Sequence, residues 1–273
     1  MAKKRICIIA KTYPRPSAKY DELVCTAGIT KSGNWIRLYP IPFRKLGFDK
    51  QYSKFHWVEA DITRNTKDFR PESYRLTSHD AIEIIDHVPA DKDGTWAARS
   101  DLLLKNVYDD LATLITDAYD PEKRVSLAVF KPKKILKFKV KACDDREWKK
   151  STLDSIKARA LQVDLFAGAQ NPFEVVEKIP YKFSYTFEDI NGKQSTPQII
   201  DWEIGQLFRN CLKDGEKAAL GKVRKKYWDD FACSKDTYLI LGTTLEHHAL
   251  NAHNPFLIIG VFPPKVEVQT RCL

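Results

Sequence analysis

Short runs of β-branched and aromatic residues, each ended by proline, glycine or a polar turn residue, recur along the chain and predict strands. In the first part of the chain these runs are Arg5–Thr12, Asp21–Thr30, Asn34–Ile41, Phe55–Arg64 and Ala81–Val88. Five strands in a segment of about 90 residues fit a small Greek-key barrel, of which the OB-fold is one example.

A helix is predicted after these strands, and then the strand-rich pattern returns. From Ser100 to Tyr119 the apolar residues recur at helical spacing, and Asp120-Pro121 predicts the end of the helix. Further strands are predicted at 125–130, 135–142, 181–187, 198–200, 237–242 and 256–262, with helices at 153–166, 201–211 and 216–232. The Asn191-Gly192 dipeptide predicts a hairpin turn that pairs 198–200 back onto 181–187. We therefore predict a mainly β fold with helical insertions (α+β): two OB-like antiparallel β-barrels, 1–98 and 121–273, joined by a linking helix at 99–120.

The charge of the chain favours a polyanionic partner. The formal net charge is +9 and the pI is about 9.1, values typical of proteins that bind nucleic acid or nucleotides. No apolar run approaches the roughly 20 residues of a membrane span, and the N-terminus lacks the apolar core of a signal peptide. We expect a cytoplasmic protein with no membrane contact.

The cysteines predict neither a metal site nor a disulfide scaffold. The chain has six, without any C-x-x-C pair, so reduced thiols are expected, with no metal and no cofactor.

The segment "CTAGITKSGNWIRLYPIPFR" (25–44) predicts a hairpin with an unusual second strand. Ile36 and Leu38 point to one face, and Trp35, Arg37 and Tyr39 to the other. Aromatic rings stack on nucleic-acid bases, and a guanidinium between them can bind a phosphate or stack as well. This face is thus predicted to bind nucleic acid; the alternative is that Trp35 and Tyr39 fill an interface with the partner domain.

Further basic and polar positions complete the predicted nucleic-acid contacts. A proline-stiffened loop at the barrel rim loses little entropy on binding a phosphate, and a row of lysines on one strand face can follow a phosphate backbone. The lysine row could equally protect an edge strand from aggregation. The contacts predicted in this way are Lys11, Tyr13, Arg15, Arg44, Lys137, Lys139, Lys141, His253 and Asn254.

The sequence favours a binding protein over an enzyme. No catalytic residue is predicted, because Walker A, Rossmann and G-x-S-x-G patterns are all missing. Asp201 and Glu203 suit a helix start better than acid–base catalysis. The alternatives are a nuclease or nucleotide-processing effector that uses Glu72 or the loop with His247, His248 and His253, or a scaffold that binds a protein partner.

Five sequence blocks resemble the prokaryotic dual OB-fold domain (DuOB) family. They are "KTYPRPSAKYDELVCTAGI", "GNWIRLYPIPFR", "DFRPESYRL", "IIDWEIGQLFRNC" and "NPFLIIGVFPP", and they span residues 11 to 264. The resemblance implies two OB-type barrels, nucleic-acid binding and a role in bacterial conflict with phage or mobile elements. It implies no catalytic mechanism. The loop before the "DWE" block, 191–196, lacks the Cys and His residues of some members, so no metal is expected there.

Overall fold

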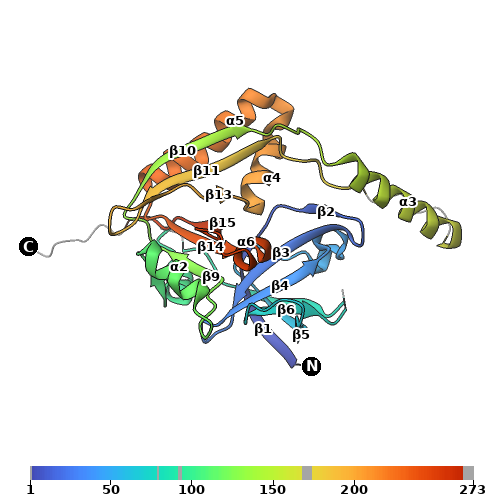
Figure 1. Cartoon of the computed structure of the whole chain (residues 1–273), viewed down its shortest axis with the longest axis horizontal. Helices are drawn as coiled ribbons and strands as arrows, with labels where there is room; N and C mark the ends of the chain where they lie inside the picture. Colours follow the sequence, from blue (N-terminus) through green and yellow to red (C-terminus); the bar gives the residue numbers. More distant parts are fainter. Residues whose placement is uncertain (1, 79, 92–93, 168–173, 267–273) are drawn as a thin grey trace, which may run out of the picture.

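The first half of the chain closes into a β-barrel, seen at the lower right of the computed structural model (Figure 1). The structure describes residues 2–78, 80–91, 94–167 and 174–266. The strands run in the order β1-β3-β4-β6-β5, and β5 pairs back onto β1, which makes a closed five-stranded barrel. The strands of this half are β1 (Ala2–Lys11), β2 (Arg15–Ser17), β3 (Asp21–Ile29), β4 (Trp35–Ile41), β5 (His56–Arg64), β6 (Ser73–Leu76) and β7 (Ile82–His87). Two 3-10 turns, η1 (Phe43–Lys45) and η2 (Phe48–Lys50), connect β4 to β5.

The alternation of side chains predicted for β4 fills this barrel. Ile36 and Leu38 are buried there with Ile6 and Ile8 of β1. The five predicted strands are all present, within three residues of their predicted ends. The sequence did not predict β2 and β6, because strands of three and four residues are too short to show a periodic pattern.

The prediction of a single linking helix between the barrels is wrong. Two helices, α1 (Ala97–Leu103) and α2 (Leu111–Tyr119), are separated by the short strand β8 (Val107–Tyr108). β8 pairs in parallel with β9, and Asp110 caps α2 by accepting a hydrogen bond from the Ala112 N–H at 2.9 Å. The apolar spacing was therefore correct for α2, but the β-branched and aromatic pair at 107–108 joins a sheet instead of the helix.

The second half forms an open half-barrel. Its strand order is β10-β11-β13-β15-β14-β9-β8, so β10 lies at one edge. Gly192, with φ of +83°, turns β11 back onto β12 and β13 as predicted. The strands of this half are β9 (Leu127–Phe130), β10 (Lys134–Ala142), β11 (Tyr181–Glu188), β12 (Gln194–Ser195), β13 (Gln198–Ile199), β14 (Tyr238–Thr243) and β15 (Phe256–Phe262).

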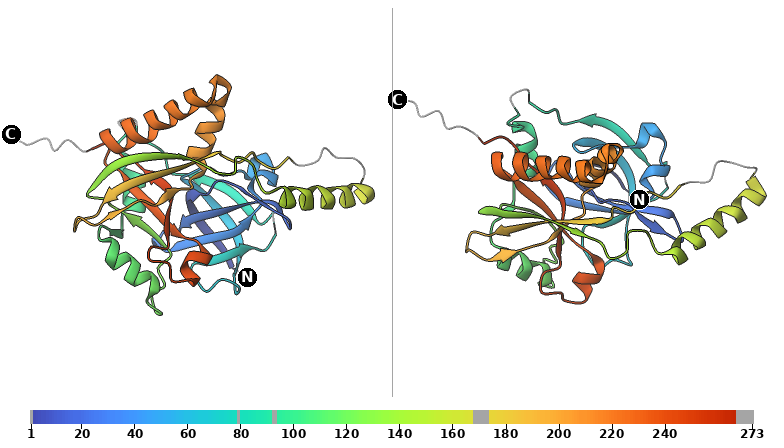
Figure 2. Two further views of the ribbon diagram at one scale, coloured as in Figure 1. Left: turned by 45° about the horizontal axis from the view of Figure 1, so that its top comes forward. Right: turned by 90° about the horizontal axis from the view of Figure 1, so that it is seen from above.

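Helices cover one face of the β10–β11 hairpin (Figures 1 and 2). Phe208 of α4, Val223 of α5 and Tyr227 of η4 share a core with Phe138 and Phe183 of the two strands. The predicted helix 216–232 changes at Lys225 from an α-helix to a π-helix. The helices of this half are α3 (Lys150–Ala167), which projects from the body, α4 (Trp202–Cys211), the 3-10 turn η3 (Leu212–Asp214), α5 (Glu216–Arg224), the π-helix η4 (Lys225–Ala232) and α6 (Leu245–Ala249).

The two halves share a hydrophobic core. β1 buries Ile6 and Ile8 inside the barrel, while Cys7 and Ile9 point outward against the second half. The same core holds Ala27, Ile29, Leu127, Val129, Ile240, Ile259 and Phe262. The predicted fold class, mainly β with two OB-like units and helical insertions, is thus confirmed, although the second unit stays open. None of the described helices has the length and apolar character needed to cross a membrane.

Candidate functional site

A cleft of about 750 Å³ lies between the two halves. Its first wall comes from the loop after β1 and from β2, β3 and β4, and its second wall from β11, β13, α4 and the β14–α6 turn. Basic side chains line it together with aromatic ones: Arg15, Arg37, Arg70, Lys178 and Lys182, and Tyr13, Tyr39, Trp148, Tyr181 and Phe183. Of the described residues that line the cleft, only Asp201 is acidic.

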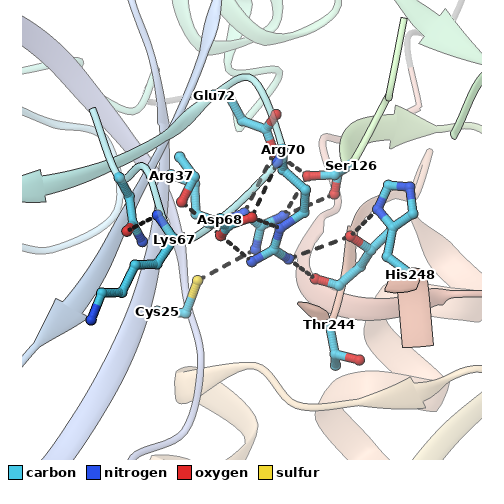
Figure 3. A network of polar contacts seen from close by, with 12 residues as sticks. Cys25, Arg37, Lys67, Asp68, Arg70, Glu72, Ser126, Thr244 and His248 are labelled. Carbon is cyan, nitrogen blue, oxygen red and sulfur yellow. Dashed lines mark hydrogen bonds and ion pairs between the residues drawn. The ribbon is translucent and has the colours of Figure 1, made fainter. Parts of the chain in front are cut away.

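Two buried arginines connect the halves at the cleft (Figure 3). Arg37 Nη2 donates to the backbone and side-chain oxygens of Ser126, at 3.0 and 2.9 Å. Arg70 Nη1 donates to the carbonyl of Thr243 at 2.8 Å. Ser126 and Thr243 belong to the second half, so these bonds fix the relative position of the two cleft walls.

Each of these arginines is paired with a carboxylate of the first half. Asp68 accepts from Nε and Nη2 of Arg70 at 2.8 and 2.6 Å, and Glu72 Oε1 lies 3.5 Å from Nε of Arg37. Burial alone would raise the pKa of Asp68, but its hydrogen bonds to Arg70 and Ser73 and the Arg70 charge lower it to about 2. The pKa of Arg37 is raised despite burial, because Cys25 and Glu72 favour its charged form.

Lys11, which the sequence predicted as a phosphate contact, lies in a buried aromatic cage. Its side chain is 5% exposed, and Nζ donates to the carbonyl of Tyr52 at 2.7 Å. Nζ also lies 4.1, 5.0 and 5.5 Å from the ring centroids of Phe43, Trp202 and Tyr52. Burial lowers the pKa of Lys11 to about 8. Lys11 is therefore removed from the predicted nucleic-acid contacts, because the cage encloses its ammonium group.

A second lysine beside this cage ties the "DWE" block to the first barrel. Lys54 Nζ lies 3.3 Å from Asp201 and 3.1 Å from Glu203. Burial opposes its charge, but the two carboxylates raise the pKa of Lys54. Asp201 caps α4 by accepting from the Glu203 N–H at 3.2 Å, as the sequence predicted. Both carboxylates thus hold the two halves together.

Tyr13 forms part of the cleft wall by packing flat on α4. Its hydroxyl donates to the Glu177 carbonyl at 2.8 Å, and its N–H donates to the Ile200 carbonyl at 2.8 Å. A Cβ at Gly205 would lie 2.2 Å from Tyr13 Cδ2, so only glycine permits this approach. Burial raises the pKa of Tyr13 to about 12. The ring is a fixed surface rather than a mobile one.

The continuous Trp35-Arg37-Tyr39 platform expected from the sequence does not form. Arg37 is only 3% exposed and packs against Ser126 of the second half. Trp35 packs on the core shared by the two halves and lines a separate cavity of about 560 Å³ with Lys105 and other residues. Tyr39 is 39% exposed and lines the cleft. The alternation was correct, but the second half covers two of the three side chains.

The lysine row on β10 is exposed, and a register shift near its start changes which residues share its face. Lys137, Lys139 and Lys141 all point to solvent. Regular alternation would place Ile135 on the same face as these lysines, but a β-bulge between Ile135 and Lys137 turns Ile135 into the core. β10 is an edge strand, so its lysines also suit edge protection.

The other predicted contacts differ in what they touch. Arg15 is exposed at the cleft, and His253 is exposed in the loop before β15. Arg44 donates to Glu22 at 2.7 Å and to the Glu174 carbonyl at 3.2 Å. Asn254 donates to Ser195 Oγ at 3.1 Å and accepts from the Phe256 N–H at 2.9 Å. Arg44 and Asn254 thus have structural partners, whereas Arg15 and His253 face solvent.

Of the groups considered for catalysis, Glu72 and His248 are engaged in protein contacts, whereas His247 and His253 are exposed. Glu72 accepts from the Ser126 hydroxyl and pairs with Arg37. His248 is buried, with Nε2 2.7 Å from the Ala118 carbonyl and Nδ1 3.2 Å from Thr243 Oγ1. Burial lowers its pKa. In the described part of the chain, no three His, Cys, Asp or Glu residues gather as metal ligands.

Several cleft residues were not predicted from the sequence. No site role was predicted for Arg70 or Cys25, and Lys182 and Thr243 lie outside the quoted sequence blocks. The five cysteines of the described ranges are unpaired thiols, as expected, and Cys272 lies outside those ranges. These residues could not be predicted because each of them becomes part of a site only when the two halves pack together and both cleft walls meet.

Fold and cleft together define a class of mainly β proteins in which two OB-type units enclose a basic groove. The model described as Domain of unknown function (DUF8757) matches residues 109–273, and the one described as Domain of unknown function (DUF8758) matches residues 2–105. The first match covers more than half of the chain, which therefore belongs to the DUF8757 family.

Two solved structures are similar to the chain. One is the crystal structure of the tetrameric p202 HIN2, with 8% identity and a TM-score of 0.30, covering 97% of this chain and 92% of the other. The second is the structure of a murine DNA binding protein bound with ds DNA, with 8% identity and a TM-score of 0.32, covering 98% and 97%. No curated protein matches the chain significantly.

Proposed function

We propose that this protein binds single-stranded or otherwise exposed nucleic acid along a basic surface that starts on β10 and enters the cleft. The observation that supports this proposal most directly is the pairing register of β10, β11 and β13. Lys139 lies opposite Ser184, which lies opposite Gln198, and Lys141 lies opposite Lys182. Residues directly opposite each other in a sheet share a face, and Lys182 and Gln198 line the cleft. The lysine row and the second cleft wall are thus one continuous surface.

The chemistry of this surface suits a nucleic-acid strand. Alternate residues of a strand are about 6.6 Å apart, so Lys137, Lys139 and Lys141 offer a row of cations to a phosphate backbone. Tyr39 and Tyr181 offer rings at the cleft, where bases can stack regardless of sequence. A cleft of about 750 Å³ is in the range of small-ligand pockets and fits a few nucleotides of a single strand better than a duplex.

The salt dependence of binding tests the lysine row. Log K for a labelled single-stranded oligonucleotide, measured by fluorescence anisotropy, should fall by roughly 0.7 per contacted phosphate for each unit of log salt. Replacing Lys137, Lys139 and Lys141 together by Ala should reduce this slope by about 2.

The matched control is the triple Ala variant of Lys213, Lys217 and Lys222, which are exposed lysines outside the cleft. It removes the same charge and should leave the slope unchanged. Equal slopes for the two triple variants would reject the lysine row as the binding surface.

Tyr39 tests base stacking in the cleft. Tyr39→Ala should weaken binding by about 1–3 kcal/mol, while Tyr39→Phe, which keeps the ring, should bind like the wild type. Both variants should keep the wild-type Tm, because Tyr39 is 39% exposed. Unchanged binding by Tyr39→Ala would refute stacking on this ring.

A role in bacterial defence is proposed from the resemblance of the sequence blocks to the dual OB-fold family. Deleting the gene from its host should then increase plaque formation by at least one infecting phage. Complementation with the lysine-row triple Ala variant should fail to restore protection. Restoration by that variant would separate any defence role from nucleic-acid binding.

A further inference from the structure

The cleft has two arginines whose side chains are almost fully buried. Arg37 is 3% exposed and Arg70 is 4% exposed, yet both line the cleft. Nη1 of Arg37 lies beside Cys25, and both arginines donate hydrogen bonds to the second half of the molecule (Figure 3). They lie deeper than the exposed cleft residues Arg15 and Lys182.

Arg70 has hydrogen-bond donors that its protein partners leave free. A guanidinium carries five N–H groups. In Arg70, Asp68 takes one from Nε and one from Nη2, and the Thr243 carbonyl takes one from Nη1. The Thr243 hydroxyl lies at the limit of hydrogen bonding, 3.5 Å from Nη1. Among the described residues, one N–H on Nη2 and one on Nη1 therefore lack a strong acceptor.

Arg37 is also incompletely satisfied. Its Nη2 group donates to the two oxygens of Ser126, and Nη1 donates to Cys25 Sγ at 3.5 Å. Nε is buried and has no hydrogen-bond partner in the described part of the chain; its ion-pair partner Glu72 lies 3.5 Å away. A buried donor without an acceptor costs free energy, so this side chain has unused capacity for an acceptor.

The charges around the pair leave the cleft electropositive. Asp68 and Glu72 neutralise the two guanidinium groups but do not line the cleft. The additional basic residues that line it are Arg15, Lys178 and Lys182, against the single carboxylate of Asp201 among the described lining residues. An anion in the cleft thus meets cations first.

We propose that Arg37 and Arg70 bind the terminal phosphate monoester of a nucleic-acid strand. This inference rests on the proposed function and adds to it a preference for a phosphorylated strand end. An internal phosphodiester carries a sugar on both sides, so it suits the exposed lysines of β10. A terminal phosphate protrudes from the strand and can reach donors that are only 3% and 4% exposed.

The two cleft walls around the pair are held in a fixed relative position. Hydrogen bonds from Arg37 to Ser126 and from Arg70 to Thr243 join the walls, and the shared core lies between the halves. Side chains held in this way lose little entropy on binding. Guanidinium groups also match the geometry of phosphate oxygens.

The test compares three oligonucleotides of one sequence: with a 5′-phosphate, with a 3′-phosphate, and with hydroxyls at both ends. The wild-type protein should bind one phosphorylated form at least tenfold more tightly than the hydroxyl form, and the two phosphorylated arms identify which end enters. Inorganic phosphate should reduce this ratio. In Arg37→Lys and Arg70→Lys the ratio should fall to about 1, because lysine lacks the planar fork of donors.

Arg75→Lys is the matched control, because Arg75 Nε is also buried without a partner but Arg75 does not line the cleft. Its phosphate preference should equal that of the wild type. Should the cleft arginine variants fail to fold, Cys25→Leu fills the space beside Arg37 while keeping both arginines, and the preference should be lost there as well.

The outcomes separate this inference from the proposed function. Equal wild-type affinity for all three oligonucleotides would overturn the terminal-phosphate site and leave nucleic-acid binding intact. A preference retained in folded Arg37→Lys and Arg70→Lys, or in Cys25→Leu, would also overturn it. Failure to bind any of the three would overturn the proposed function itself.

Discussion

The caged ammonium group of Lys11 should give the protein an unusual alkaline pH dependence of stability. The pKa of Lys11 falls from 10.5 to about 8, mainly through burial. Between these pH values the unfolded chain binds a proton that the folded chain does not. The free energy of unfolding therefore rises with pH in this window.

The size of the effect follows from the two pKa values. A shift of one pKa unit corresponds to about 1.4 kcal/mol, so the shift of Lys11 amounts to about 3 kcal/mol. Stability gained in this way is fully present above pH 10.5 and is lost as the pH falls through about 8. The side chain is 5% exposed, so solvent screening reduces this figure little.

Lys11→Met provides the reference, because it keeps an unbranched side chain in the cage and removes the titrating group. Urea unfolding of both proteins at several pH values from 7 to 10.5 cancels the titration of the other groups. The wild type should gain about 3 kcal/mol relative to Lys11→Met across this range. A stability difference that is constant with pH, or that changes in the opposite direction, would refute a buried Lys11 with a lowered pKa.

Three other substitutions test the structural contacts. Lys54→Met leaves Asp201 buried without its cation and should cost about 3–5 kcal/mol; the double variant with Asp201→Asn should recover much of this loss in urea unfolding. Trp35→Ala should lower the free energy of unfolding by about 3 kcal/mol or more without a specific loss of oligonucleotide affinity, and the reverse pattern would restore Trp35 as a ligand contact. Because burial lowers the pKa of His248 below 6.5, stability should fall as the pH drops from 6.5 through that lowered pKa. His248→Phe should show a shallower fall in acid unfolding curves, and parallel curves would contradict this assignment.

Local patterns predicted the strands well because each strand carries its own signal. The alternation of Ile36 and Leu38 correctly identified the face of β4 that fills the barrel, and the ends of β15 were predicted at Phe256 and Phe262. The prediction of one helix across Val107 was wrong, although the apolar spacing there fits a helix. Val107 instead lies in β8, which pairs with β9, and such a long-range contact leaves no local sequence pattern. The bulge after Ile135 is likewise invisible in a single strand.

The candidate site was predictable only in part, because it depends on how the two halves meet. The sequence predicted Arg37 and Tyr39 as nucleic-acid contacts, and both line the cleft. It could not show that Ser126 covers one side of Arg37, or that a cage encloses Lys11. The lysine row could be predicted because the alternation of residues along one strand does not depend on contacts with other elements.

The outward face of β1 has a consequence for synthesis of the protein on the ribosome. Cys7 and Ile9 are covered by Ile240, Ile259 and other residues that come late in the chain. While the N-terminal barrel is already complete, this apolar face stays uncovered until nearly all of the second half has been translated. Exposed apolar surface on such an intermediate favours aggregation. Premature stops in the second half should therefore yield insoluble fragments, even though they leave the first barrel intact.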